Sequence, residues 1–203
     1  MNLSQPSLNR VAVFIDNSNV FNRIKEKIQL KETGWDCFYD PLYLAQRLAG
    51  QRQLTFVGFY CSPPPSYLAQ GTPAEQKRYS QQMQYYSEVT NLPNVTVRYG
   101  SVGGSRWNLQ EKNLDTQITA DMITMAAQNK YDVAVLVSND GDYVSAVRPT
   151  KEEFGKKVEV LYFRKRVSMV LRQVCDLPRR ARPSFFRRLP NLPPPHGQDV
   201  VSI

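Results

Sequence analysis

Histidine and cysteine are scarce in this sequence of 203 residues. The one histidine, His196, lies in a proline-rich stretch near the C-terminus, which argues against histidine-based acid–base catalysis and against a zinc protease. The three cysteines, Cys37, Cys61 and Cys175, share neither metal-binding nor redox spacing. An odd number of cysteines without a C-x-x-C pair indicates a reducing compartment and no disulfide framework.

Long apolar runs are also missing. No stretch approaches the roughly 18 apolar residues that a membrane-spanning helix needs. The first ten residues contain no apolar run of the kind found in secretory signal peptides. No G-x-G-x-x-G motif follows the first apolar run, which excludes a dinucleotide-binding site of that type. We therefore expect a soluble, cytoplasmic protein without a membrane span.

Positive charge is concentrated in one segment near the C-terminus. The formal net charge is +8, and residues 164–188 contain nine basic residues against one acidic residue, so the rest of the chain is balanced. A local basic segment favours binding to polyanions, either nucleic acid or an anionic membrane.

Short apolar runs predict five strands that alternate with helices. The strands are expected at residues 11–15, 54–60, 94–99, 133–137 and 158–163, and the helices near 20–28, 41–49, 73–89, 114–127, 142–154 and 167–174. This alternation predicts an α/β fold: a doubly wound parallel sheet of five strands in the order 3-2-1-4-5, with helices on both faces. Residues 1–177 would form the domain, and the Arg- and Pro-rich residues 178–203 a flexible tail unless bound.

Acidic residues gather where two of these strands end. The strand at 11–15 leads into Asp16, and the strand at 133–137 leads into Asp140 and Asp142. In the predicted order the two strands are neighbours, so their acids meet at the carboxyl edge, where ligands of such sheets bind. Asp115, at the start of the helix at 114–127, is a fourth candidate. Clustered carboxylates repel one another, and Mg²⁺ or Mn²⁺ would offset that repulsion through the oxygen ligands that these ions prefer.

Each of these residues also has a simpler explanation. Asp16, Asn19 and one of the pair Asp140 and Asp142 could cap helices, although one cap does not need both acids. Asp115 could be favoured by the helix dipole, and Asn19 could instead orient Asp16 or a water. Two residues are expected to support the ligands rather than bind the metal: Ser138, and Asp121, which points about 120° away from Asp115 around the helix.

Two groups of residues are expected to hold RNA. In the loop at 100–112, Arg106, Trp107 and Lys112 combine positive charge with a stacking surface, which suits a single strand. Ordinary surface charges, and a lid over the core in the case of Trp107, are the alternatives. The C-terminal segment would hold the RNA backbone without reading bases, through Arg164, Lys165, Arg166, Arg179, Arg180 and Arg182.

Four ordered motifs resemble the NYN domain, in its LabA/DUF88-like branch of the PIN-like nuclease superfamily. They are DNSN at residues 16–19, KNLDTQITAD at 112–121, LVSNDGDY at 136–143 and FGKKVEVL at 154–161. The resemblance spans about residues 10–163. It departs from the family pattern at SNDGD, where SGDSD is commoner, and at Asn17, where Gly is frequent, but neither departure removes an acid.

The resemblance implies a PIN-like, Rossmann-like fold and a metal-dependent ribonuclease site. The matching acids are Asp16, Asp115, Asp140 and Asp142, Asn19 is the matching asparagine, and Asp121 matches a further acidic position. We therefore expect a ribonuclease that uses Mg²⁺ or Mn²⁺ on single-stranded or structured RNA, and a homodimer is compatible with this interpretation.

Other functions remain open at this point. A catalytically silent RNA-binding or regulatory adaptor could use the same fold, because fold does not imply function. The basic tail could instead dock a protein partner or an acidic lipid. A haloacid dehalogenase-like phosphatase fits worse, because that site needs Asp-x-Asp after the first strand, whereas Asp16 is followed by Asn17 and Ser18.

Overall fold

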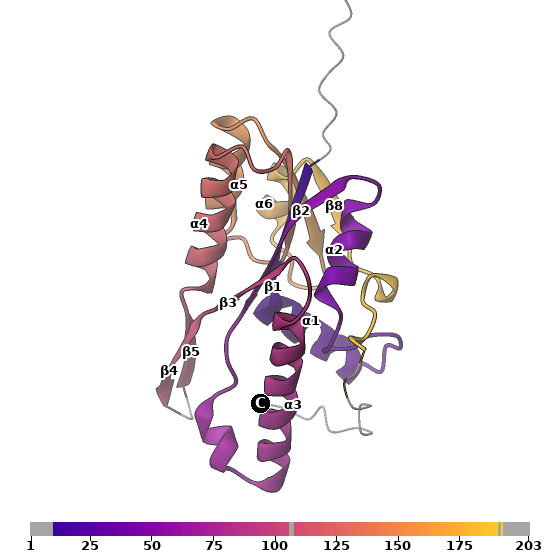
Figure 1. Ribbon diagram of the computed structural model, residues 1–203, viewed down its shortest axis with the longest axis vertical. Coiled ribbons are helices and arrows are strands. Elements are labelled where there is room, and N and C mark those ends of the chain that lie inside the picture. Colours follow the sequence, from indigo (N-terminus) through magenta and orange to yellow (C-terminus); the bar gives the residue numbers. More distant parts are fainter. Residues whose placement is uncertain (1–9, 106–107, 191, 193–203) are drawn as a thin grey trace, which may run out of the picture.

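A parallel sheet forms the centre of the computed structural model, which describes residues 10–105, 108–190 and 192, with backbone alone at 102–105 and 108–112 (Figure 1). Within these residues six strands pair in parallel in the order β3-β2-β1-β6-β7-β8. The five predicted strands are present in the predicted order, and a sixth strand extends the sheet. The strands are β1 (Arg10–Asp16), β2 (Gln53–Cys61), β3 (Val95–Tyr99), β6 (Val133–Val137), β7 (Lys157–Tyr162) and β8 (Leu177–Arg180).

Helices cover both faces of the sheet, as predicted, because its central strands are apolar on both sides. In β1, Val11, Val13 and Ile15 face one core, while Ala12 and Phe14 face the other. The first core lies under helices α1 (Asn17–Gln29), α2 (Pro41–Ala49) and α3 (Pro73–Thr90). The second lies under helices α4 (Leu114–Ala127), α5 (Val144–Glu152) and α6 (Met169–Val174).

Two predicted helix starts, those of α2 and α3, are confirmed by their caps. The Asp40 side chain accepts a hydrogen bond from the Tyr43 backbone at the start of α2. At the start of α3, Thr72 and Glu75 form the reciprocal capping box that their spacing predicts. Short 3₁₀ helices also occur at η1 (Ser66–Gln70) and η2 (Pro183–Phe185). Local polar signals thus place these helices before any tertiary contact is considered.

The sequence prediction is wrong about the stretch after residue 177. Residues Leu177–Arg180 form the edge strand β8, and beyond it Ala181, Phe186 and Leu189 are buried. The described part of the expected tail is therefore packed on the domain. Its strand was missed because Leu-Pro-Arg-Arg has no apolar alternation, and proline is tolerated only at sheet edges. The rest of the stretch, residues 191 and 193–203, lies outside the described residues.

The loop expected at 100–112 is instead an antiparallel hairpin of β4 (Ser101–Ser105) and β5 (Asn108–Lys112). The hairpin and much of α3 extend past the sheet on the side where β1 leads into α1 (Figure 1). They therefore flank the carboxyl edge of the sheet. Among the described helices, none has the length and apolar character required to cross a bilayer. The described residues give no support to a homodimer.

Candidate functional site

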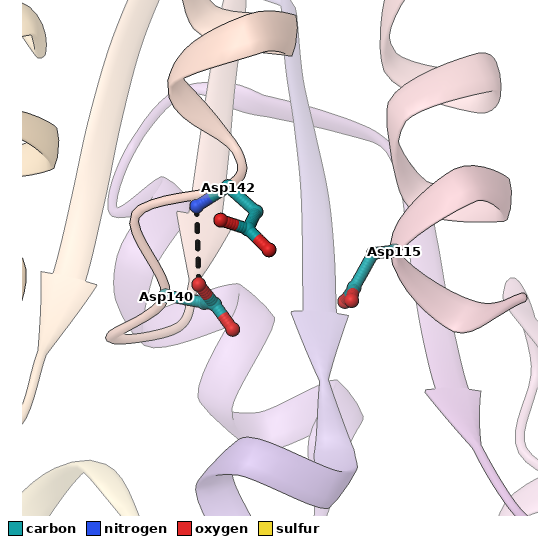
Figure 2. A group of neighbouring side chains, drawn as sticks. All are labelled: Asp115, Asp140 and Asp142. Carbon is teal, nitrogen blue, oxygen red and sulfur yellow. Dashed lines mark hydrogen bonds between the residues drawn. The ribbon is translucent and has the colours of Figure 1, made fainter. Parts of the chain in front are cut away.

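Three carboxylates converge at the carboxyl edge. Asp115 lies in the first turn of α4, and Asp140 and Asp142 lie in the loop after β6. One oxygen from each lies within 4.8 Å of the others, and Figure 2 shows the side chains directed toward a common space from two elements. Asp115 and Asp142 are exposed, and Asp140 is half-buried. The Asp142 backbone N–H donates to Asp140 at 3.0 Å, which fixes the loop between them.

Asp16 lies beside this group, at the end of β1. It caps α1 by accepting from the Asn19 backbone at 3.0 Å, and its other oxygen accepts from Ser138 Oγ at 2.9 Å. The capping interpretation of Asp16 is therefore confirmed. Asp16 is not one of the three converging carboxylates, but it lines the same cleft as Asp115 and Asp140. The predicted adjacency of the first and fourth strands is confirmed by the register that pairs Ile15 with Val137.

Tyr143 links the buried and exposed acids. Its hydroxyl lies 2.6 Å from Asp115 Oδ1 and 3.2 Å from Asp16 Oδ2. Burial, together with the charge of Asp16 and the hydrogen bond to Asp115, raises the pKa of Tyr143, so the hydroxyl keeps its proton and donates. The sequence analysis assigned Tyr143 no role. Its place at the end of the LVSNDGDY motif was the one available signal.

Asn139 and Asn19 hold the acidic loop in place. Asn19 Oδ1 accepts from the Asn139 backbone at 3.2 Å. The Asn139 side chain accepts from the Phe163 backbone N–H at 2.7 Å and donates to the carbonyls of Phe163 and Lys165 at 2.9 and 2.7 Å. Asn139, noted above as a departure from the family pattern, therefore ties the acidic loop to the segment after β7.

Gly141, the other departure from the family pattern in this loop, also contacts the segment after β7. A Cβ atom at Gly141 would lie 2.8 Å from Ser168 Oγ, closer than real contacts allow. Ser168 also donates its backbone N–H to the Asn139 carbonyl at 3.1 Å. Both unusual residues, Asn139 and Gly141, thus accommodate the same segment, residues 163–168.

Asp121 lies apart from the converging acids. Its carboxylate accepts from the Tyr60 hydroxyl at 2.8 Å and pairs with Arg98 Nε at 3.2 Å. Burial, with the charge of Asp121, raises the pKa of Tyr60, which keeps that hydroxyl protonated. Among the described residues, Asp121 has no contact with the converging acids, and its support of the ligands stays a prediction. Ser138, in contrast, contacts Asp16 and accepts from the Asp140 backbone at 3.1 Å.

The residues predicted to hold RNA have different surroundings. Arg106 and Trp107 lie outside the described residues, and Lys112 is described by its backbone alone, at the end of β5. Arg179 is held inside the fold by Glu159 at 2.6 Å and by the Leu48 carbonyl at 3.0 Å. Arg179 is therefore a structural residue rather than a free ligand for RNA.

The other basic candidates surround the loop after β7. Lys165 is exposed, and Arg166 is exposed with Glu26 at 3.8 Å. Arg164, Arg180 and Arg182 line one further cleft. The structure thus places five of the six C-terminal candidates near the carboxyl ends of β7 and β8.

The acidic group fits a hard divalent cation. Its donors are all carboxylate oxygens, which Mg²⁺ and Mn²⁺ prefer to nitrogen or sulfur. Among the described side chains, no lysine or arginine pairs with Asp115, Asp140 or Asp142. Three negative charges at this spacing repel one another, so a bound cation would stabilise the arrangement.

Comparison with known proteins identifies the family of the chain and a solved structure with a similar fold. The family model for the NYN domain matches residues 10–178, whereas no curated protein sequence matches the chain. Among solved structures, a protein of unknown function from Vibrio parahaemolyticus is similar, with a TM-score of 0.62 and 18% identity over 91% of this chain and 100% of the other. That likeness shows a shared fold. The family match covers most of the chain, and the chain therefore belongs to the NYN domain family, within the PIN-like nuclease superfamily.

Proposed function

We propose that this protein is a metal-dependent ribonuclease that hydrolyses RNA phosphodiester bonds. The observation that carries the proposal is the convergence of Asp115, Asp140 and Asp142 without a basic partner among the described side chains. A protein that only binds a polyanion gains nothing from clustered negative charge, which repels its ligand. A cation held by these acids would reverse that effect.

Asp115, Asp140 and Asp142 would hold Mg²⁺ or Mn²⁺, and Asp16 would contribute directly or through water. Such an ion supplies a nucleophile from water at neutral pH and offsets charge on the phosphate. Tyr143 orients Asp115, and Ser138 orients Asp16, through the hydrogen bonds described above. Supporting contacts of this kind keep carboxylates in position for a metal.

Basic side chains adjoin the acids where the RNA backbone would pass. A shallow cleft beside the acidic group is lined by Asp140 and Asn19, and also by Arg23 and Arg166. Guanidinium groups bind phosphate oxygens through paired hydrogen bonds without reading the bases. We therefore expect affinity for RNA to depend on salt and only weakly on sequence.

The test is cleavage of a mixed set of labelled RNAs with Mn²⁺, Mg²⁺ or EDTA. Wild-type protein should cut with metal and not with EDTA, and Asp140→Asn should not cut. Glu153→Gln is the matched control, because Glu153 is an exposed acid just after α5, at the opposite edge of the sheet. If Asp140→Asn cleaves RNA as fast as wild type after contaminating nucleases are excluded, the assignment as a metal-dependent nuclease is wrong.

A second readout separates a nuclease from the adaptor alternative. Metal at about 100 times its Kd should stabilise the folded state by about 2.7 kcal/mol. For a chain of this size that corresponds to a rise in Tm of about 5–10 °C. Asp140→Asn should lose most of this rise. RNA binding without metal stabilisation and without cleavage would favour an adaptor.

A further inference from the structure

A second cleft lies at the carboxyl ends of β7 and β8, and we call it the Trp35 cleft. It has a volume of about 380 Å³. Its lining residues come from the end of α1, the loop after it, and the segments that follow β7 and β8. They are Lys27, Glu32, Thr33, Trp35, Phe163, Arg164, Arg180, Ala181, Arg182 and Pro183.

The Trp35 cleft carries an excess of positive charge. Its one acid, Glu32, pairs with Lys27 at 2.8 Å, so these two charges cancel. Arg164, Arg180 and Arg182 are exposed and have no carboxylate partner among the described residues. Unpaired guanidinium groups around one cleft suit an anion, and their planar donors suit phosphate in particular.

An aromatic ring lies among these charges. Trp35 is half-buried and packs on the rings of Phe163 and Phe186, with centroids 5.6 and 5.4 Å away. Trp35 is also one of the residues that line the cleft. A rigidly backed indole beside guanidinium groups matches the chemistry of a nucleotide, whose base stacks on aromatic faces while its phosphate binds arginine. An acidic peptide would use the charges but not the stacking surface.

The Trp35 cleft is physically joined to the acidic site. Asn139, next to Asp140, bonds the backbone of both Phe163 and Lys165, which flank Arg164. On α1, Arg23 and Lys27 are four residues apart and so lie on the same face of the helix. Arg23 lines the shallow cleft beside Asp140, and Lys27 lines the Trp35 cleft. One helix face therefore borders both clefts.

We propose that the Trp35 cleft is a nucleotide subsite for single-stranded RNA. Its arginines bind a phosphate and Trp35 stacks a base of a strand whose cleaved bond lies at the acidic group. The identity of the ligand rests on the proposed nuclease function. The subsite would fix how far from the metal the strand is held, and it would act on single-stranded regions because only an unpaired base can stack there.

The first test measures binding of labelled single-stranded RNA in an Asp140→Asn background, which removes cleavage. Arg164→Ala with Arg182→Ala should weaken binding at least about tenfold. It should also lower the slope of log affinity against log salt by about 0.7, because the arginines share one phosphate and each phosphate neutralised on a single strand contributes about 0.7.

The control is Arg47→Ala with Lys130→Ala, which removes the same charge from exposed positions at the amino edge of the sheet. It should change affinity by less than about twofold, as surface charges far from a bound strand do. Equal weakening by both double variants, or by neither, would overturn the subsite.

The second test reports stacking. Trp107→Phe leaves Trp35 as the one tryptophan in the chain. Adenosine monophosphate should quench Trp35 fluorescence in a saturable way, and inorganic phosphate should not. The quenching should disappear when Arg164→Ala and Arg182→Ala are added. No quenching, or equal changes with phosphate alone, would exclude a nucleotide subsite.

Neither readout depends on cleavage, so the two proposals can fail separately. If the protein cleaves RNA with metal but neither binding test shows an effect, the nuclease proposal stands and the subsite proposal is wrong. If Trp35 is quenched and binding depends on the arginines, but the protein cleaves no RNA, the nucleotide-binding cleft stands and the nuclease proposal is wrong.

Discussion

Two groups of carboxylates in this molecule differ in how their charge is balanced. Glu159 lies buried on β7 and pairs with Arg52 at 2.7 Å and with Arg179 at 2.6 Å. The acids at the carboxyl edge converge within 4.8 Å of one another without such a partner among the described side chains. The contrast separates a carboxylate whose charge the fold balances from carboxylates whose charge no described basic side chain balances.

Other carboxylates away from the site are also paired with basic side chains, as Glu159 is. Asp132, just before β6, pairs with Arg10 at 2.7 Å, and Asp176, just before β8, pairs with Lys151 at 3.2 Å. These pairs join segments far apart in sequence. Removing one partner of such a pair exposes an unbalanced charge and costs stability, whereas removing one of several repelling carboxylates does not.

The largest expected effect comes from neutralising one acid of each kind. Asp140→Asn should reduce RNA cleavage at least about a thousandfold, because a metal ligand is lost, while Tm without metal stays the same or rises. Glu159→Gln should lower the free energy of unfolding by about 2–3 kcal/mol, because two arginines lose their partner in a partly exposed setting.

Cleavage per folded Glu159→Gln molecule should remain near the wild-type value. Paired cleavage assays and urea titrations measure both properties on the same preparations. The distinction between balanced and unbalanced carboxylates is contradicted if folded Glu159→Gln loses activity, or if Asp140→Asn destabilises the metal-free protein.

The next effect concerns the tyrosine that orients the acids. Tyr143→Phe should lower metal affinity or cleavage about 10- to 100-fold, because contacts that support metal ligands have effects of this size. Tyr131→Phe is the control, since the Tyr131 hydroxyl is also buried but bonds the Met122 carbonyl at 2.6 Å. Cleavage rates across a Mn²⁺ titration distinguish the two, and equal losses would assign Tyr143 a structural role alone.

A smaller effect should follow from loosening the link between the acidic loop and the Trp35 cleft. Asn139→Gly removes three side-chain hydrogen bonds. The free energy of unfolding should fall by about 1–3 kcal/mol. The KM for RNA should rise more than kcat falls, because the displaced segment carries Arg164.

Steady-state kinetics on a short RNA provide this measurement. Asn129→Gly serves as control, because Asn129 Oδ1 bonds Arg10 and Lys156 at the amino edge, away from the cleft. An unchanged KM in Asn139→Gly would separate the two regions functionally.

The smallest effect is a pH dependence on the structural side of the comparison. The hydrogen bond from Arg10 holds the pKa of Asp132 below its usual value of 3.8. As pH falls, Asp132 is therefore protonated in the unfolded chain before it is protonated in the folded protein. The stabilisation from the pair is present above about pH 4 and is lost as pH falls through the pKa of Asp132 in the folded protein.

Asp132→Asn should be less stable than wild type at pH 6, and the difference should shrink below pH 4. Urea midpoints at both pH values measure it. A difference that does not change with pH would show that Asp132 contributes through its hydrogen bonds rather than its charge.

The sequence by itself determined the central sheet and the place of the acids. Uniform apolar runs such as residues 133–137 indicate strands buried on both faces, and caps such as Asp40 and Thr72 place helix starts through local hydrogen bonds. The parallel order then brings Asp16 and Asp140 to one edge, because the carboxyl ends of neighbouring parallel strands coincide.

Tertiary structure alone decided the roles of residues whose local sequence is uninformative. Arg179 and Arg180 are neighbours in a basic run, but successive residues of a strand point to opposite sides. Arg179 therefore reaches Glu159 and holds β8 on the sheet, while Arg180 lines the Trp35 cleft. Asn139 likewise acquires its partners only when β7 lies beside β6. Their roles depend on contacts between distant segments, which composition and periodicity do not encode.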